Sequence, residues 1–292
     1  TKVIHVTGVH SDNKNALVPS QVVFNNDGTK MFIAGHAGNK KIDYWSLTTA
    51  FDVSTASFDG EYSLIGKEQR ANSIAFNNDG TRMFIAGVGN DTQVRIHEFS
   101  LDTAFDLSSG VTQLNTEDLI SFQNHIDGVT FNYDGTKMYT ITYMNKDGTE
   151  AQDLMNQFKL TTPYDVSTLS LEGTYTVSSV SGDSREVVFS NDGSKMFIID
   201  DSPLDNSNNK VHEFNLSCNW SVIDGACDDP ITTSDGGKDI LSSIESQTAT
   251  AKQIAIHATT PVLNRMFWLR RHRSNDQLSN QNIRLNFSNS MM

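Results

Sequence analysis

The chain has 292 residues, of which 37% are hydrophobic and 20% charged, and it carries a formal net charge of −13. A chain of this length can bury a substantial core. We expect neither a membrane-spanning helix, which needs about 20 consecutive apolar residues, nor a signal peptide. Residues 218–292 hold 7 basic and 7 acidic residues, so the acidic excess belongs to residues 1–217. An acidic body repels phosphate groups, which argues against nucleic-acid binding.

The first predicted element is a strand at residues 2–8, an apolar run with no hairpin partner ahead of it. A motif that occurs four times follows it. The first copy reads Phe-Asn-Asn-Asp-Gly-Thr-Lys-Met-Phe over residues 24–32, and the later copies are centred on Asp79, Asp134 and Asp192. The successive spacings of 52, 55 and 58 residues are typical of propellers and other repeat proteins.

Each copy of the motif predicts a β-hairpin followed by two more strands. Asp-Gly supplies the tight turn between two short apolar runs, because glycine accepts positive φ. In the first repeat a third strand covers residues 41–47, a connector covers residues 48–57, and a fourth strand covers residues 58–64. Residues 102–108 and 161–167 repeat the connector. Four short antiparallel strands per repeat form the blade of a β-propeller.

The ends of the array predict how the ring closes. The fourth repeat stops after its third strand at Leu216, and residues 2–8 precede the first repeat as residues 61–64 precede the second. We therefore predict an all-β, four-bladed β-propeller over residues 1–217. The N-terminal strand would be the fourth strand of the last blade, which removes exposed sheet edges. The alternative is half of a larger ring that a second copy completes.

The innermost strand of each predicted blade begins with polar residues that differ from blade to blade. In a propeller these positions surround the mouth of the tunnel, beside loops that rigid blades hold in place. We predict a ligand-binding site there, formed by Ser20, Gln21, Asn72, Ser73, Asp127, Arg185 and Glu186. A solvated rim without a ligand is the alternative.

The loop at residues 200–209 is rich in the oxygen atoms that calcium prefers. Its candidate ligands are Asp200, Asp201 and Asp205, although the loop lacks the spacing and the bidentate glutamate of an EF-hand. We expect a solvated acidic loop and no cofactor, with calcium binding as the alternative.

Two His-Glu pairs, His97-Glu98 and His212-Glu213, occupy the same position of the third strand in two repeats. Neighbouring residues on a strand point to opposite faces, so the two side chains of a pair cannot converge on one substrate. The chain also shows no nucleophile elbow, phosphate loop or zinc signature. We therefore predict that the protein is not an enzyme. The alternative is a hydrolase built from charged residues of the tunnel mouth.

Residues 218–237 are predicted to form a disulfide loop and a linker. Cys218 and Cys227 are the two cysteines of the chain, and no further Cys or His lies near them at the spacing of a metal site. A disulfide between them predicts an oxidising, exported location. Two unpaired thiols are the alternative.

Residues 238–292 are predicted to form a helical tail that ends in a strand-like segment. Apolar residues recur with a helical period in residues 238–257, and Pro261 can occupy the first turn of a second helix that runs to about Arg273. Basic residues at the end of that helix complement its dipole. The alternative is a partner-binding surface formed by Arg265, Trp268, Arg270, Arg271 and Arg273.

Two parts of the chain resemble known families. The motif at residues 24–32 and the connector at residues 48–57 resemble the propeller repeats of surface and secreted proteins of marine bacteria and their viruses. Residues 261–273 and 278–283 look like the segment that precedes the outer-membrane barrel in autotransporter-like proteins of such bacteria. That likeness implies a passenger displayed on, or released from, the cell surface. No barrel follows in this sequence, so we do not expect the chain itself to insert into a membrane.

The sequence thus predicts a non-enzymatic binding and adhesion module, located outside the cell or at the outer-membrane surface. Repeats of this kind leave function to loops, so the propeller loops would recognise a glycan or a protein. The tail would anchor the ring, associate with an outer-membrane barrel, or make the chain self-associate. The alternative is a structural subunit of a surface appendage or filament that assembles through the tail.

Overall fold

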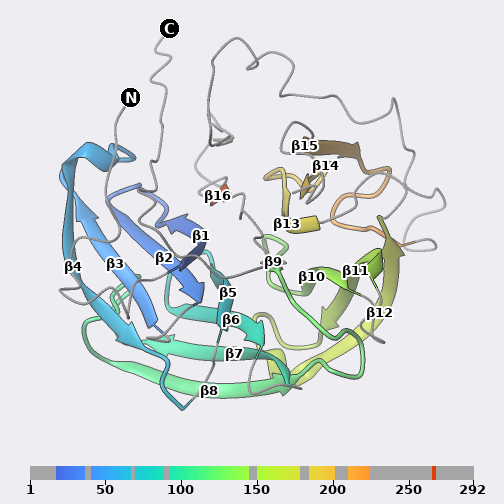
Figure 1. The fold of residues 1–292 in the computed structure, drawn as a ribbon, viewed down its shortest axis with the longest axis horizontal. Helices are drawn as coiled ribbons and strands as arrows, with labels where there is room; N and C mark the ends of the chain where they lie inside the picture. Colours follow the sequence, from blue (N-terminus) through green and yellow to red (C-terminus); the bar gives the residue numbers. More distant parts are fainter. Residues whose placement is uncertain are drawn as a thin grey trace, which may run out of the picture.

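The computed structural model describes residues 18–36, 41–66, 70–88, 93–144, 150–177, 184–200, 210–223 and 265–267. These residues form antiparallel sheets that are arranged as blades around a common centre (Figure 1). The chain passes from one blade to the next around the ring, and the described residues contain no α-helix. The all-β, four-bladed propeller that the repeats predict is confirmed.

Each blade is built from consecutive strands. Blade 1 contains β1 (Val18–Phe24), β2 (Lys30–His36), β3 (Lys41–Leu47) and β4 (Ala56–Ser63), and blade 2 contains β5 (Arg70–Phe76), β6 (Arg82–Val88), β7 (Val94–Leu101) and β8 (Val111–Asp118). Blade 3 contains β9 (Gly128–Phe131), β10 (Lys137–Met144), β11 (Glu150–Leu160) and β12 (Leu169–Thr176), and blade 4 contains β13 (Ser184–Phe189), β14 (Lys195–Asp200) and β15 (Lys210–Asn215). The 3-10 helices η1 (Val53–Thr55) and η2 (Val166–Thr168) lie in two of the connectors.

The Asp-Gly motif forms a similar hydrogen-bonded turn in every blade, and the first copy shows why. Gly28 has a φ of +72°, which glycine adopts without strain. The Oδ1 atom of Asp27 accepts from the N–H of Thr29 at 2.9 Å, and the Oδ1 atom of Asn25 accepts from the N–H of Lys30 at 2.8 Å. These bonds satisfy the backbone of the turn and hold the register of the hairpin.

An aromatic residue of each connector lies over the turn glycine of its own blade. Phe105 has a left-handed φ of +56°, and a Cβ atom added to Gly80 would lie 2.1 Å from its ring. The N–H of Phe105 donates to the carbonyl of Gly80 at 2.9 Å. The equivalent pairs are Phe51 with Gly28, Tyr164 with Gly135, and Trp220 with Gly193.

The fourth repeat continues beyond the end that we predicted at Leu216. Trp220 has a φ of +60°, and its N–H donates to the carbonyl of Gly193 at 2.9 Å, as in the other connectors. The hydroxyl of Tyr139 in blade 3 also donates to the carbonyl of Trp220. Residues 217–223 are therefore the connector of blade 4, which corrects the prediction that the chain leaves the repeat pattern after Leu216.

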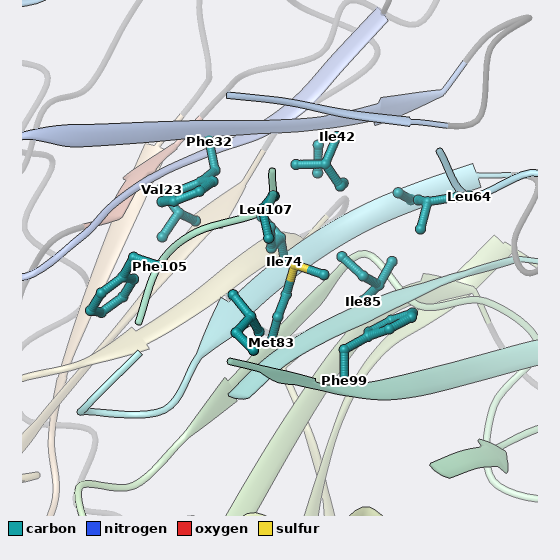
Figure 2. Packing of buried hydrophobic residues seen from close by; sticks show 13 residues of the cluster. Val23, Phe32, Ile42, Leu64, Ile74, Met83, Ile85, Phe99, Phe105 and Leu107 are labelled. Carbon is teal, nitrogen blue, oxygen red and sulfur yellow. The ribbon is translucent and has the colours of Figure 1, made fainter. Parts of the chain in front are cut away.

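Apolar clusters between neighbouring blades form the core. Figure 2 shows the cluster between blades 1 and 2, where Phe32 and Ile42 of blade 1 meet Ile74, Ile85 and Phe99 of blade 2. These five side chains are fully buried. Similar clusters join blade 2 to blade 3 and blade 3 to blade 4. The removal of this apolar surface from water holds the blades together, and so fixes the strand ends that form the candidate site.

The two ends of the chain are described only in part. Residues 2–8, which we predicted to close the last blade, lie outside the described residues, as does most of the predicted helical tail. Within the predicted second helix, Arg265–Phe267 is described, and it is a strand, β16, instead of a helix. β16 pairs antiparallel with β1, with Met266 opposite Val22. Periodicity alone cannot assign so short an apolar segment, and the rest of the predicted helical tail stays a prediction.

Candidate functional site

The predicted ligand-binding residues lie at two consecutive levels of the innermost strands. The mouth level consists of Ser20, Asn72, Asp127 and Arg185, and the belt level consists of Gln21, Ser73 and Glu186. Gly128, which was not predicted, occupies the belt level in blade 3. In β1, β5 and β13 the strand ladder shifts register at the mouth-level residue, which lies between two paired positions. Such an irregularity re-aims side chains, which allows consecutive polar residues to reach neighbouring blades.

At the belt level, side chains join the blades into a circle. The Nε2 atom of Gln21 in blade 1 donates to Oε2 of Glu186 in blade 4 at 2.5 Å. The Oε1 atom of Gln21 accepts from the hydroxyl of Ser73 at 3.1 Å and from the N–H of Ile74 at 2.5 Å, both in blade 2. Ser73 Oγ in turn accepts from the N–H of Val129 in blade 3 at 3.0 Å. The ring therefore closes within one chain, and the alternative of a larger ring completed by a second copy is wrong.

Gly128 completes the belt between blades 3 and 4 because it lacks a side chain. A Cβ atom at Gly128 would lie 2.6 Å from Oε1 of Glu186 and 3.1 Å from the Cα atom of the same residue. The glycine thus lets the Glu186 carboxylate lie close to β9. Oε1 of the same carboxylate accepts from the N–H of Val187 in β13 at 3.1 Å. Glu186 is only 5% exposed and its carboxylate binds protein donors on both oxygens. Its observed contacts hold the ring together.

Two of the mouth-level residues bind the backbone of the next blade. The hydroxyl of Ser20 donates to the carbonyl of Ala71 at 2.9 Å, and Nδ2 of Asn72 donates to the carbonyl of Ile126 at 2.7 Å. A polar side chain that satisfies a neighbouring carbonyl in this way stabilises the blade interface. These contacts leave Asp127 and Arg185 as the charged residues of the mouth level.

Asp127 and Arg185 form a charged cluster with His125, which we call the mouth cluster. Nη1 of Arg185 lies 3.4 Å from Oδ1 of Asp127, and Nδ1 of His125 lies 3.0 Å from Oδ2 of the same carboxylate. The exposed fractions of the three side chains are 9% for Arg185, 8% for Asp127 and 12% for His125. One carboxylate thus bridges a guanidinium and an imidazole where blade 3 meets blade 4. The cluster combines charged donors with a charged acceptor, which suits a ligand rich in polar groups.

His125 was not among the predicted site residues. Its spacing was a signal, because His125 lies two residues before Asp127 and residues two apart share a side wherever the chain is extended. Its loop is fastened to blade 3 by Gln123, which is fully buried. The Oε1 atom of Gln123 accepts from Oγ1 of Thr140 at 2.8 Å and from Nδ2 of Asn156 at 2.7 Å. These bonds place His125 beside the start of β9.

The His-Glu pairs on the third strands do not converge, as expected from strand geometry. Nδ1 of His97 lies 2.9 Å from Oγ1 of Thr116, whereas the carboxylate of Glu98 binds Arg82 and accepts from the N–H of Val166 at 3.0 Å. Glu98 is fully buried and links blade 2 to the connector of blade 3. This pair therefore has a structural role in blade packing.

Of the three candidate calcium ligands in the loop at residues 200–209, only Asp200 is described. Asp200 is buried, and its Oδ2 atom lies 3.5 Å from Nε2 of His212. Asp201 and Asp205 lie outside the described residues. Within the described ranges, no group of three or more His, Cys, Asp or Glu residues is placed to hold a metal ion. The solvated acidic loop stays a prediction, and calcium binding stays its untested alternative.

The predictions for the end of the chain also stay open. Cys218 belongs to the connector of blade 4, but Cys227 is not described, so the disulfide stays a prediction. Arg265 lies in β16, while the other predicted partner-binding residues of the tail, Trp268, Arg270, Arg271 and Arg273, are outside the described residues. The described part of the chain has no helix that is long and apolar enough to span a membrane.

Comparison with known proteins identifies no family for this chain. No family model matches the chain, and no curated protein matches its sequence. Similar solved structures include a candidate 6-phosphogluconolactonase from Bacteroides fragilis, with 14% identity and a TM-score of 0.45, and a periplasmic gluconolactonase from Pseudomonas aeruginosa, with 16% and 0.44. Another is Sqt1 from Chaetomium thermophilum, with 11% identity and a TM-score of 0.41. The matches cover 73%, 73% and 77% of this chain but 54%, 54% and 48% of those proteins, so the chain spans about half of their length.

Two of these similar structures carry the names of enzymes, which corrects the prediction that this protein is not an enzyme. At these identities and TM-scores the likeness assigns no activity to this chain, and the propeller fold that its own strands form gives no reason to exclude catalysis. The propeller part of the family resemblance is confirmed. The relation to marine bacteria and their viruses, and the autotransporter-like tail, stay predictions.

Proposed function

We propose that this protein is a recognition module that binds a polar ligand, a glycan or a protein, at the mouth of its ring. The observation that carries the proposal is the mouth cluster of His125, Asp127 and Arg185. At the same level, the side chains of Ser20 and Asn72 bind backbone carbonyls of the next blade. The mouth cluster therefore differs from Ser20 and Asn72, whose observed contacts join neighbouring blades.

The chemistry of the mouth cluster favours ligands with hydroxyl or carboxylate groups. A guanidinium presents several N–H donors in a fixed fork and binds such groups with good geometry. A neighbouring carboxylate accepts hydrogen bonds from hydroxyl groups. Sugars combine closely spaced hydroxyls, so a glycan is the first ligand class to test. The predicted disulfide supports a secreted or cell-surface location for this proposal, since disulfides persist in oxidising compartments.

A glycan array probed with the full chain tests the proposal. We expect binding to a defined subset of glycans, and we expect Arg185→Gln to weaken it by about ten- to a hundredfold, because hydrogen bonds to charged groups contribute about 1.5–3 kcal/mol. Lys159→Gln is the matched control, since Lys159 is an exposed cation in β11 away from the mouth. Binding that Arg185→Gln leaves unchanged would exclude the mouth cluster as the site, and a blank array would argue against glycan recognition.

The pairing of His125 with Asp127 favours hydrolysis as a second candidate function. An imidazole that a carboxylate orients can take a proton from water and so act as a general base. Esters and lactones are the substrates to screen, because a base-activated water suffices to attack their carbonyl carbon. We expect turnover that falls by about a hundredfold or more in His125→Gln, the usual contribution of a positioned base. Turnover that does not depend on His125 would reject this candidate.

A further inference from the structure

Strand β16 joins the innermost edge of blade 1, although it comes from near the other end of the sequence. Gln21 lies opposite Phe267, Val22 opposite Met266, and Val23 opposite Arg265. In blades 3 and 4 the innermost strands β9 and β13 end their sheets, with no strand added on that side among the described residues. Figure 1 shows β16 inside the ring, on the side where blade 4 meets blade 1.

The apolar packing at this junction, which we call the seam, differs from that of the other blade junctions. Each of the other three clusters combines residues of two neighbouring blades. The cluster on the seam side of blade 1 has no described member from blade 4 and consists of Val22, Phe24, Met31, Ile33, Trp45, Leu47 and Val53. On the blade 4 side Phe197 is partly exposed, whereas its equivalents Phe32, Phe84 and Tyr139 are fully buried.

A hydrogen bond that recurs between other blades is also missing among the described residues of the seam. In two other junctions, a third-strand side chain accepts from a connector N–H of the next blade: Glu98 from Val166 at 3.0 Å, and Gln157 from Val222 at 2.9 Å. The equivalent pair across the seam is Glu213 with Val53. The carboxylate of Glu213 binds Lys195 of its own blade, as that of Glu98 also binds Arg82.

We propose that the seam is a docking site for an extended segment of this same chain, the C-terminal segment that contains Arg265–Phe267. Val22, Met31 and Ile33 are fully buried, although their cluster has no described member from blade 4. The strand that lies against β1 at this point is β16, with Met266 opposite Val22. An innermost strand offers unpaired N–H and C=O groups that accept an added strand. The bond between Gln21 and Glu186 closes the ring at this junction, and the C-terminal segment adds a strand contact where the described apolar clusters do not join blade 1 to blade 4.

A disulfide trap in the full chain tests this placement. In the variant Val22→Cys with Met266→Cys, the two sulfurs lie on directly opposed residues, and we expect mild oxidation to link them within one chain. The control is Val22→Cys with Ser170→Cys, for which we expect no link because Ser170 is exposed in β12 of blade 3. Peptide mapping separates the engineered link from Cys218 and Cys227. No engineered link, or a link between two chains that gives a covalent dimer, would overturn the proposal.

Hydrogen exchange gives a second measurement on the intact chain. Proline cannot donate to a strand ladder, so Met266→Pro is expected to speed amide exchange in residues 18–24 by about tenfold or more, as local opening becomes easier. Exchange in β10 and β11 is expected to stay unchanged. Ser279→Pro is the matched control and should leave β1 protected. Unchanged exchange of β1 in Met266→Pro would overturn the proposal.

Discussion

Gln21 donates to the carboxylate of Glu186 at 2.5 Å across 165 positions of sequence, and this bond joins the first blade to the last. Both side chains are almost fully buried. A buried carboxylate that loses a donor is destabilised, so the bond from Gln21 favours the closed ring. Arg185 precedes Glu186 on the same strand, and the closure that positions Glu186 therefore also positions Arg185 beside Asp127.

We predict that Gly80→Ala destabilises the protein more than Gly66→Ala does. Both glycines have left-handed φ values, +73° and +82°, where a side chain costs about 1–2 kcal/mol. At Gly80 the added Cβ would also meet the ring of Phe105 at 2.1 Å, whereas nothing lies within 4 Å at Gly66. Overpacking adds about 1–3 kcal/mol, so urea unfolding should show that additional loss for Gly80→Ala. Equal losses would mean that the Phe105 ring moves aside at no cost.

A second prediction concerns the close approach of blades 3 and 4 at Gly128. Gly128→Ala places a methyl group against Oε1 of Glu186 and is expected to lower the free energy of unfolding by about 1–3 kcal/mol. In a Glu186→Ala background the carboxylate is absent, so the same substitution should be less destabilising. Denaturant unfolding of the four proteins measures this non-additivity. An identical loss in both backgrounds would show that the carboxylate is not the atom group that Gly128 accommodates.

Because the aspartates of the Asp-Gly turns have lowered pKa values, we predict that the folded protein loses stability in acid. The hydroxyl and backbone N–H of Thr81 lower the pKa of Asp79, and hydrogen bonds from Ser190 and Ser194 lower the pKa of Asp192 to about 2. A folded pKa below the unfolded value of about 3.9 gives stabilisation that is complete above that value and is lost as the pH falls toward 2. Asp79→Asn should therefore lose less stability than the wild type between pH 5 and pH 2. Parallel pH profiles of the denaturant midpoint would contradict this assignment.

The blades could be predicted from the sequence because their signals are local. Asp27 and Gly28 mark a tight turn, and the apolar runs on either side mark two strands within a few residues of it. The repeat also gave the positions of the tunnel mouth, since Ser20, Asn72 and Arg185 occupy equivalent places in different copies. The structure places each of these residues at a register shift near the start of its innermost strand.

Three features were not predicted, because the interactions that determine them join residues far apart in the sequence. Trp220 was not predicted as the connector aromatic of blade 4, because the other connectors have Phe or Tyr at this position. The turn needs only a flat ring over Gly193, which Trp also supplies. The Gln21–Glu186 bond joins residues that are far apart in the sequence, so no spacing rule finds it. The strand at Arg265–Phe267 depends on pairing with β1, and that tertiary contact decides between strand and helix for a short apolar segment.

The coupling energy between Gln21 and Glu186 tests the closed ring, and the mouth cluster that depends on it, most directly. The wild type, Gln21→Ala, Glu186→Ala and the double variant are unfolded in denaturant under the same conditions. Closure within one chain predicts a coupling of about 1.5–3 kcal/mol, because the bond is buried and its acceptor is charged. Single-variant losses that simply add, with a coupling below about 0.5 kcal/mol, would contradict the contact between blade 1 and blade 4.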